Sequence, residues 1–224
     1  MNQNTAILIF ANSAKKEVER KSFLSIKVFS ELNQQILKTA GKTKLPYFHF
    51  SEKQQVGNSF GERFTNAIET VINKGFKNVI VIGNDTPHLT TKHIFEAVGQ
   101  LENNDLVLGP SKDGGFYLMG VKKEHFNKNV FLNLPWQTSS LLISISKGFE
   151  LKNIDTHYLN LLSDIDTLQD VKPVLESFIS ISIKLKELLL QIIFINKKLF
   201  SKTKLLIQNP IQNLFLNKGS PLFI

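Results

Sequence analysis

The 224-residue sequence predicts an α/β domain in which helices cover both faces of a mostly parallel sheet. Two observations carry this prediction. Short apolar runs alternate along the chain with longer segments whose apolar residues recur at helical spacing. Several of these runs end abruptly in glycine or aspartate, as strands do where they lead into loops. Hydrophobic residues make up 42% of the chain and charged residues 21%, which is ordinary for a protein with a packed core.

In the first half of the chain, strands and helices are predicted to alternate. Ser22–Ala40 carries apolar residues at helical spacing, and Gly41 is a plausible stop. The helix Thr90–Leu101 begins with threonine, a common N-cap residue. The other predicted elements are the strands Ala6–Ala11, Leu45–Phe50 and Asn78–Ile82, and the helix Gly61–Lys74.

The second half continues the alternation. Asp105–Leu108 and Phe116–Val121 read as strands, and Thr138–Lys147 reads as a helix. We expect an extended stretch over Glu150–Ile154 and then a helix over Thr167–Phe178. These elements complete a predicted domain of residues 1–178.

Residues 179–224 differ in composition from the domain, because they are rich in Ile, Leu, Phe and Lys and almost free of acids. Ile181–Phe200 could form one amphipathic helix, and the pattern beyond Ser201 is irregular. We interpret this segment as a C-terminal helix that packs on the domain, followed by an irregular tail. The alternative is a helix that contacts a partner or a membrane surface.

Composition also excludes classes of function. The chain has no cysteine, which excludes disulfides, thiolate metal sites and a cysteine nucleophile, and it fits a cytoplasmic protein. The net charge is +8, but Arg20 and Arg63 are the only arginines, so nucleic-acid binding is not expected. The apolar run Leu188–Ile195 is too short to span a bilayer, and no transmembrane segment is predicted.

Two predicted strands each end in an aspartate. Asp85 follows Asn78–Ile82, and Asp113 follows the strand that ends near Leu108. Ligands of open α/β sheets bind at the carboxyl ends of the strands. A carboxylate at Asp85 could hold Mg²⁺ or Mn²⁺ against a diphosphate, or it could only cap a turn.

Asp113 is followed by Gly114 and Gly115, which leave no side chain in the way of a bound substrate. The alternative is a hairpin-like turn. Asp164 and Asp166 lie on one side of an extended chain. One of them could be an N-cap, and the other could complete a metal site with Asp85.

Three further residues are candidates for contact with a substrate. Trp136 and Thr138 lie in Pro135–Thr138, and the single tryptophan could wall a pocket or anchor the core. Arg63, at the start of a predicted helix, could bind phosphate or pair with a neighbouring glutamate.

Four motifs occur in an order that resembles a bacterial family, DUF2064. They are GNDTPHLT at 83–90, GPSKDGGFYLMG at 109–120, LPWQTS at 134–139 and DIDTLQDV at 164–171. Members of this family are described as glycosyltransferase-like or as transferases associated with radical-SAM/selenodomain genes. The resemblance implies a GT-A-like, three-layer α/β/α sandwich with a nucleotide over the N-terminal half of the sheet. It also implies a divalent cation held by Asp85 with Asp164 or Asp166, and Asp113 as a possible general base near the acceptor.

Related sequences carry a phosphate-cradling loop with proline and glycine after the first strand. Here the corresponding segment, Phe10–Lys21, lacks both and contains Glu17 and Glu19. The candidates for nucleotide binding that the resemblance implies in it are Phe10, Ala11, Lys15, Arg20 and Lys21, joined by Arg63 from the later helix.

The expected function is therefore metal-dependent transfer from a nucleotide or nucleotide-sugar donor to a small-molecule acceptor, in the manner of a glycosyltransferase. A nucleotidyltransferase of the same fold would use the same parts. A protein of this fold that binds its ligand without turnover, as a scaffold, is the alternative that the altered Phe10–Lys21 segment motivates.

Overall fold

The computed structural model describes residues 4–208, with side chains as far as residue 195. Its centre is a six-stranded sheet in the order β2-β1-β3-β5-β4-β6. Only β5 runs antiparallel to its neighbours, so the predicted mostly parallel sheet is confirmed. The strands are β1 (Thr5–Phe10), β2 (Tyr47–Phe50), β3 (Asn78–Ile82), β4 (Leu106–Pro110), β5 (Phe116–Lys122) and β6 (Thr156–Tyr158).

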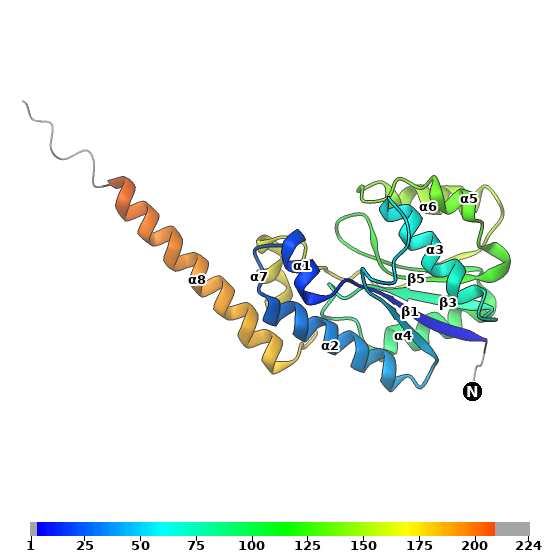
Figure 1. Cartoon of the computed structure of the whole chain (residues 1–224), viewed down its shortest axis with the longest axis horizontal. Coiled ribbons are helices and arrows are strands. Elements are labelled where there is room, and N and C mark those ends of the chain that lie inside the picture. Colours follow the sequence, from blue (N-terminus) through cyan, green and yellow to red (C-terminus); the bar gives the residue numbers. More distant parts are fainter. Residues whose placement is uncertain (1–3, 209–224) are drawn as a thin grey trace, which may run out of the picture.

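Helices cover both faces of this sheet, which gives three layers (Figure 1). Successive strand residues point to opposite faces, so Leu8 and Val81 pack beneath α3 and α6, while Ile7 and Ile80 pack against α2 and α4. The helices are α1 (Ala14–Arg20), α2 (Ile26–Lys42), α3 (Phe60–Ile72), α4 (Thr91–Asn103), α5 (Lys128–Leu132), α6 (Leu141–Glu150), α7 (Leu168–Glu176) and α8 (Ile183–Gln208), with a short 3₁₀ turn at Lys123–His125.

Serine caps decide where several helices begin. The Ser25 hydroxyl accepts the N–H of Val28, so α2 begins at Ile26, four residues later than predicted. Ser13 caps the unpredicted helix α1 in the same way, through the N–H of Lys16. The segment after β1 is therefore helical and not an open loop.

The extended stretch predicted at Glu150–Ile154 is wrong. Helix α6 continues to Glu150, and a turn follows in which Asn153 has φ 53°. Pairing with β4 starts only where the Asp155 carbonyl accepts the N–H of Asp105 and Leu106, which places β6 just after the predicted stretch.

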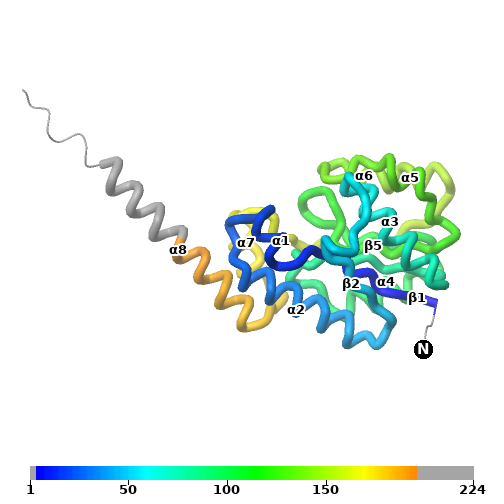
Figure 2. Tube along the Cα trace, in the orientation of Figure 1, coloured from blue at the N-terminus to red at the C-terminus, as the bar shows by residue number. Residues whose placement is uncertain are grey.

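The first turns of α8 belong to the body of the protein. Leu185 and Leu189 are fully buried in a third core that also contains Phe29 of α2 and Val174 of α7. Farther on, α8 leads away from the sheet, as Figures 1 and 2 show. It reaches Gln208 and so extends past the predicted end at Phe200, and the rest of the predicted tail lies outside the described residues. None of the described helices combines the length and hydropathy that a bilayer-spanning segment needs.

Two neighbouring leucines test whether α8 stabilises the domain. Leu189 is fully buried, whereas Leu190 is 48% exposed. We expect Leu189→Ala to lower the free energy of unfolding by about 2–4 kcal/mol, because it leaves a cavity between α8, α2 and α7. The matched Leu190→Ala should cost less than about 1 kcal/mol. Urea unfolding of both variants checks this, and equal losses would mean that α8 does not pack as described.

Candidate active site

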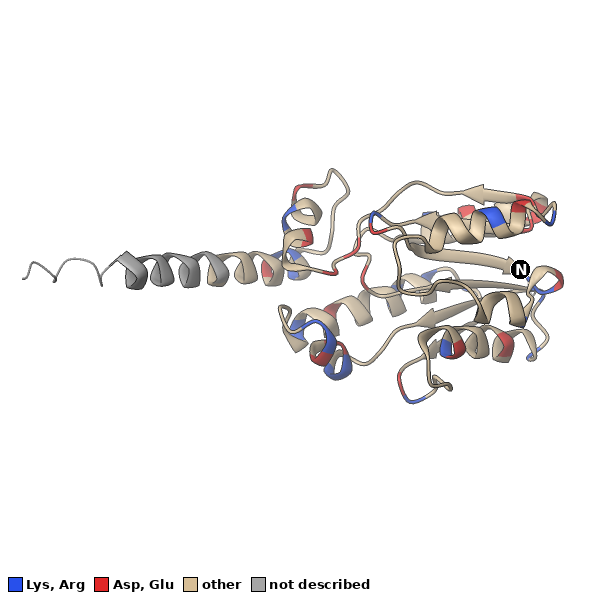
Figure 3. Ribbon diagram, turned by 90° about the horizontal axis from the view of Figure 1, so that it is seen from above, with Lys and Arg blue, Asp and Glu red and all other residues tan. Residues whose placement is uncertain are grey.

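A cleft of about 780 Å³ opens at the carboxyl ends of β1, β3 and β4. The loops that follow these strands line it, together with α1, the start of α3 and the segment before α6. Figure 3 shows acidic positions on loops at the end of the sheet that faces α8. The cleft therefore lies at the sheet edge that the strand-end aspartates predicted.

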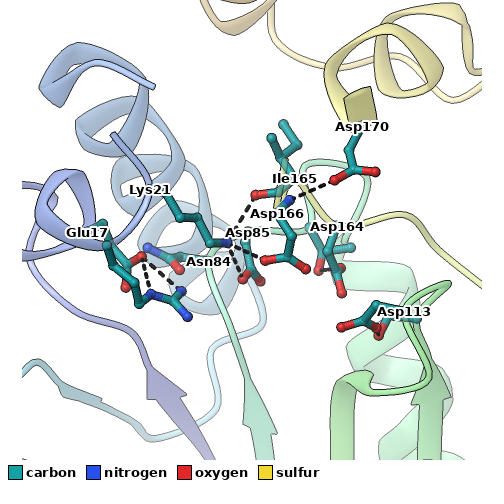
Figure 4. A network of polar contacts seen from close by, with 12 residues as sticks. Glu17, Lys21, Asn84, Asp85, Asp113, Asp164, Ile165, Asp166 and Asp170 are labelled. Atoms are coloured by element: carbon teal, nitrogen blue, oxygen red, sulfur yellow. Dashed lines mark hydrogen bonds and ion pairs between the residues drawn. The ribbon is translucent and has the colours of Figure 1, made fainter. Parts of the chain in front are cut away.

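The predicted acidic residues meet at one end of this cleft (Figure 4). Asp85 follows β3, Asp113 lies between β4 and β5, and the pair Asp164 and Asp166 lies between β6 and α7. The N–H of Ile165 donates to the Asp85 carbonyl at 2.9 Å, which ties the last segment to the first. Carboxylate oxygens of Asp113, Asp164 and Asp166 lie within 4.8 Å of one another.

Lys21 enters this cluster from the end of α1. Its side chain is only 6% exposed, and Nζ lies 2.6 Å from Asp166 Oδ1 and 3.1 Å from Asp85 Oδ2. It also donates to the Ile165 carbonyl at 3.0 Å. Burial lowers the pKa of Lys21, but attraction to Asp85 and Asp166 outweighs burial and leaves the pKa above its usual value.

The cluster shifts the acidity of its carboxyls in opposite directions. Burial raises the pKa of Asp85, but the Lys21 ammonium more than offsets this and holds the pKa below the usual range. Burial and repulsion from Asp85 raise the pKa of Asp164 to about 8, against the opposing hydrogen bond from the Thr86 hydroxyl. Burial likewise raises the pKa of Asp166, with Asp85 adding to it and Lys21 opposing it.

This donor set fits a hard divalent cation. Asp113, Asp164 and Asp166 each offer a carboxylate oxygen, which is the ligand that Mg²⁺ and Mn²⁺ prefer. Six acidic side chains and three basic ones line the cleft, so a cation would also relieve its negative charge. Asp85, which we predicted as the main metal ligand, is paired with Lys21, and so is Asp166.

A second group of the described residues, Asp105, Glu124 and His125, also brings possible ligand atoms within 4.8 Å. It lies outside the cleft, and Asp105 already binds Lys122 and the N–H of Asp155.

In the segment predicted to bind phosphate, several polar groups are already hydrogen-bonded to other residues of the protein. Glu17 is 3% exposed, accepts a hydrogen bond from Asn12 at 2.7 Å and pairs with Arg20 at 3.0 Å. The backbone N–H and hydroxyl of Ser13 both donate to Glu52 at 2.7 Å. Of the candidates here, Phe10, Ala11 and Arg20 line the cleft, Lys21 lies behind it, and Lys15 is exposed outside it.

Aromatic side chains form the opposite wall. Trp136 lies 4.7 Å from Phe64 and 5.5 Å from Phe60, measured between ring centroids, and its Nε1 donates to the Phe131 carbonyl at 2.7 Å. It therefore walls the cleft and anchors the core at once. A Cβ added to Gly61 would lie 2.4 Å from the Trp136 ring, so only glycine fits at this position.

Three further predicted residues, Arg63, Gly115 and Thr138, line the cleft. Arg63 donates to the Asn58 carbonyl at 3.4 Å, whereas Glu69 pairs with Lys128.

Gly114 has a different reason to be glycine. Its φ is 89°, and a Cβ there would lie 2.2 Å from the Ser139 carbonyl oxygen. The bare Cα lets the Asp113 loop pack on the segment before α6. Gly114 is not among the residues that line the cleft.

Several polar residues of the cleft were not predicted from the sequence, and Glu52 and Gln55 are two of them. Glu52 and Gln55 follow β2 in the way that Asp85 follows β3, so the same strand-end rule identifies them once β2 is placed. His88, in contrast, is 3% exposed and is not among the residues that line the cleft, and burial lowers its pKa.

Comparisons with known proteins agree with this fold. The model of the family described as "Uncharacterized protein conserved in bacteria (DUF2064)" matches residues 17–138. A presumed nucleotide-diphospho-sugar transferase from Desulfovibrio desulfuricans G20 is similar in structure, with a TM-score of 0.73 and 20% identity over 84% of this chain and 95% of that one. A homolog of Rv0371c from Mycobacterium sp. strain JC1 has a TM-score of 0.49 and 9% identity over 78% of this chain and 96% of its own. A search of the curated proteins found no match.

The packing of Gly61 on Trp136 gives a first prediction for the site. We expect Gly61→Ala to lower the free energy of unfolding by about 1–3 kcal/mol, because the new methyl group overlaps the indole ring. In the control Gly99→Ala, nothing lies within 4 Å of the added Cβ in α4, and stability should rise by up to about 1 kcal/mol. Chemical denaturation separates the two, and an unchanged Gly61→Ala protein would contradict this packing.

The raised pKa of Asp164 predicts a dependence of stability on pH. The folded protein keeps this carboxyl protonated up to about pH 8, whereas the unfolded chain releases the proton near its ordinary pKa of 3.8. Asp164 therefore destabilises the folded state more and more as the pH rises from about 4 to about 8. Between about pH 5 and about pH 9, wild type should lose on the order of 2 kcal/mol more stability than Asp164→Asn.

The comparison is made by urea unfolding of both proteins at the two pH values. The lowered pKa of His88 acts with the opposite sign, since a histidine kept neutral destabilises the folded state as the pH falls. That contribution is present in both proteins and cancels in the difference. Parallel pH profiles for wild type and Asp164→Asn would refute the assignment.

Proposed function

The chain belongs to the DUF2064 family, and we propose that it is a transferase that uses a nucleotide-activated donor and a divalent cation. The observation that carries this proposal is the cleft at the strand ends, in which the three carboxylates Asp113, Asp164 and Asp166 face an aromatic and cationic wall. Transfer of a glycosyl group is the reaction that we favour. Nucleotidyl transfer, which would use the same parts, is the alternative.

The donor half of the cleft suits a nucleotide. A volume of about 780 Å³ falls in the range of ligand pockets for molecules of this size. The ring of Phe10 and the side-chain amides of Asn12 and Gln55 can meet a base, and the Arg63 guanidinium can meet a phosphate. The printed name of the Desulfovibrio protein, a presumed nucleotide-diphospho-sugar transferase, agrees with such a donor.

Charge supports the participation of a cation. Six acidic and three basic side chains line the cleft, and Lys21 neutralises part of the acidic cluster, so a cation between the remaining carboxylates and a diphosphate would lower their repulsion. We assign the cation to Asp113, Asp164 and Asp166. When bound, Mg²⁺ or Mn²⁺ would neutralise negative charge on the departing phosphate.

The acceptor would enter beside the Asp113 loop. This loop is held against the segment before α6, because the N–H of Leu142 donates to the Gly114 carbonyl at 3.0 Å. Asp113 is the exposed member of the carboxylate set, so it can reach an acceptor hydroxyl. Trp136 and Thr138 border the same region and would orient the acceptor.

A second candidate is a protein that binds its ligand without turnover. The contacts of Glu17 and Glu52 favour it, because they occupy the N–H of Ser13 and the Arg20 guanidinium, groups that would otherwise be free for phosphate. The two candidates differ in whether the bound donor is consumed.

A thermal-shift screen of nucleoside diphosphates and nucleotide sugars, with and without Mn²⁺, tests the proposal. We expect one nucleotide class to stabilise the protein only when Mn²⁺ is present, with a gain of about 3 kcal/mol at a hundredfold excess over Kd. Asp113→Asn should abolish the Mn²⁺-dependent part. Asp105→Asn, which removes the carboxylate of the other ligand group, should leave it intact.

The outcomes separate the candidates. No response to any nucleotide would count against both, and loss of the response in Asp105→Asn alone would place the cation outside the cleft. For a ligand that does bind, release of nucleoside diphosphate from a nucleotide sugar with an added sugar acceptor identifies glycosyl transfer. Release of pyrophosphate from a nucleoside triphosphate with a sugar phosphate identifies nucleotidyl transfer. A stable complex that releases neither product identifies a binding protein.

A further inference from the structure

The end of α1 fixes the position of Lys21 within the acidic cluster. Lys21 directly follows the helix, and its backbone N–H donates to the Glu17 carbonyl at 2.8 Å. The side chain then runs inward and is 6% exposed, an unusual burial for a lysine. Figure 4 shows it pointing between Asp85 and Asp166.

The ammonium group has as many acceptors as it has protons. Nζ lies 2.6 Å from Asp166 Oδ1, 3.1 Å from Asp85 Oδ2 and 3.0 Å from the Ile165 carbonyl oxygen. An ammonium carries three N–H donors, so each has a partner. A buried charge is tolerated when it is paired and hydrogen-bonded in this way.

The same three oxygens would suit a divalent cation. Two carboxylates and one main-chain carbonyl form an oxygen set that Mg²⁺ or Mn²⁺ accepts. A divalent cation that approached Asp85 from this side would meet the charge of Lys21 and three donors that already hold the oxygens. The pairing of Asp85 therefore competes with metal binding at Asp85.

We propose that the Lys21 ammonium is a built-in cation of this site, which takes the place of a metal ion between Asp85 and Asp166. A divalent cation is then confined to Asp113, Asp164 and Asp166, and Asp85 does not touch it. Lys21 acts as a positioning residue, because it orients Asp166 and neutralises Asp85. The existence of the divalent cation rests on the function proposed above, whereas the pairing of Lys21 does not.

The helical segment after β1 has a role in this arrangement. A glycine turn would present backbone N–H groups to a ligand, whereas the seven residues of α1 deliver a lysine to the acids. The segment thereby places a positive charge at the base of the site.

Mn²⁺ binding measured by electron paramagnetic resonance tests the proposal, with Asp105→Asn as the parent so that the second ligand group is silent. We expect Lys21→Met, which keeps the length of the side chain but not its charge, to bind an additional Mn²⁺. Adding Asp85→Asn to that variant should remove the gain. Lys21→Arg, which restores the charge, should behave like the parent.

One comparison keeps Lys21 in place, in case Lys21→Met does not fold. Asp85→Asn in the parent should leave Mn²⁺ affinity unchanged, and weakening by about tenfold or more would overturn the proposal, because it would make Asp85 a ligand. Failure of the proposed function looks different. In that case the parent binds no Mn²⁺, yet Lys21→Met gains a site that depends on Asp85. A parent that binds Mn²⁺ and a Lys21→Met variant that gains nothing would refute the role of Lys21 alone.

Discussion

The geometry of the site depends on one buried ion triad, in which the Lys21 ammonium joins Asp85 to Asp166. The three residues come from the end of α1, the loop after β3 and the segment between β6 and α7. Without the ammonium, carboxylates that lie close together would repel one another at the base of the cleft. The triad therefore fixes three loops at once. Asp164 has no such cationic partner in the triad, and burial and repulsion from Asp85 raise its pKa.

The sheet supplies the frame for this triad. β5 runs antiparallel between β3 and β4, so the chain turns back after β4 and leaves the Asp113 loop at the same edge as Asp85. The other wall is held by Trp136, whose ring packs on Phe64 and against the bare Cα of Gly61. One edge of the sheet thus carries acids on one side and aromatic rings on the other.

Much of this arrangement could be predicted from the sequence, because strand ends in α/β sheets have a known location. The positions of Asp85, Asp113, Asp164 and Asp166 followed from that rule, and the structure brings them together. The pairing within the cluster could not be predicted. Lys21 and Asp85 are 64 residues apart, and no local pattern states which of several cations reaches a given acid. Helix α1 was missed for a related reason, since its seven residues show little apolar periodicity and depend on the cap at Ser13.

The missed pairing changes how the altered segment after β1 is interpreted. As a loop, it would lack the proline and glycine of a phosphate-binding turn and carry Glu17 and Glu19 in their place. As a helix, it uses Glu17 to hold Asn12 and Arg20, and it ends in the one lysine that the acids require. A sequence change that removes backbone N–H donors from a site can thus still supply it with a positive charge, when a lysine side chain reaches the acids from a neighbouring helix. For this chain the relevant comparison is therefore the net charge around Asp85 and Asp166, and not the presence of a glycine turn.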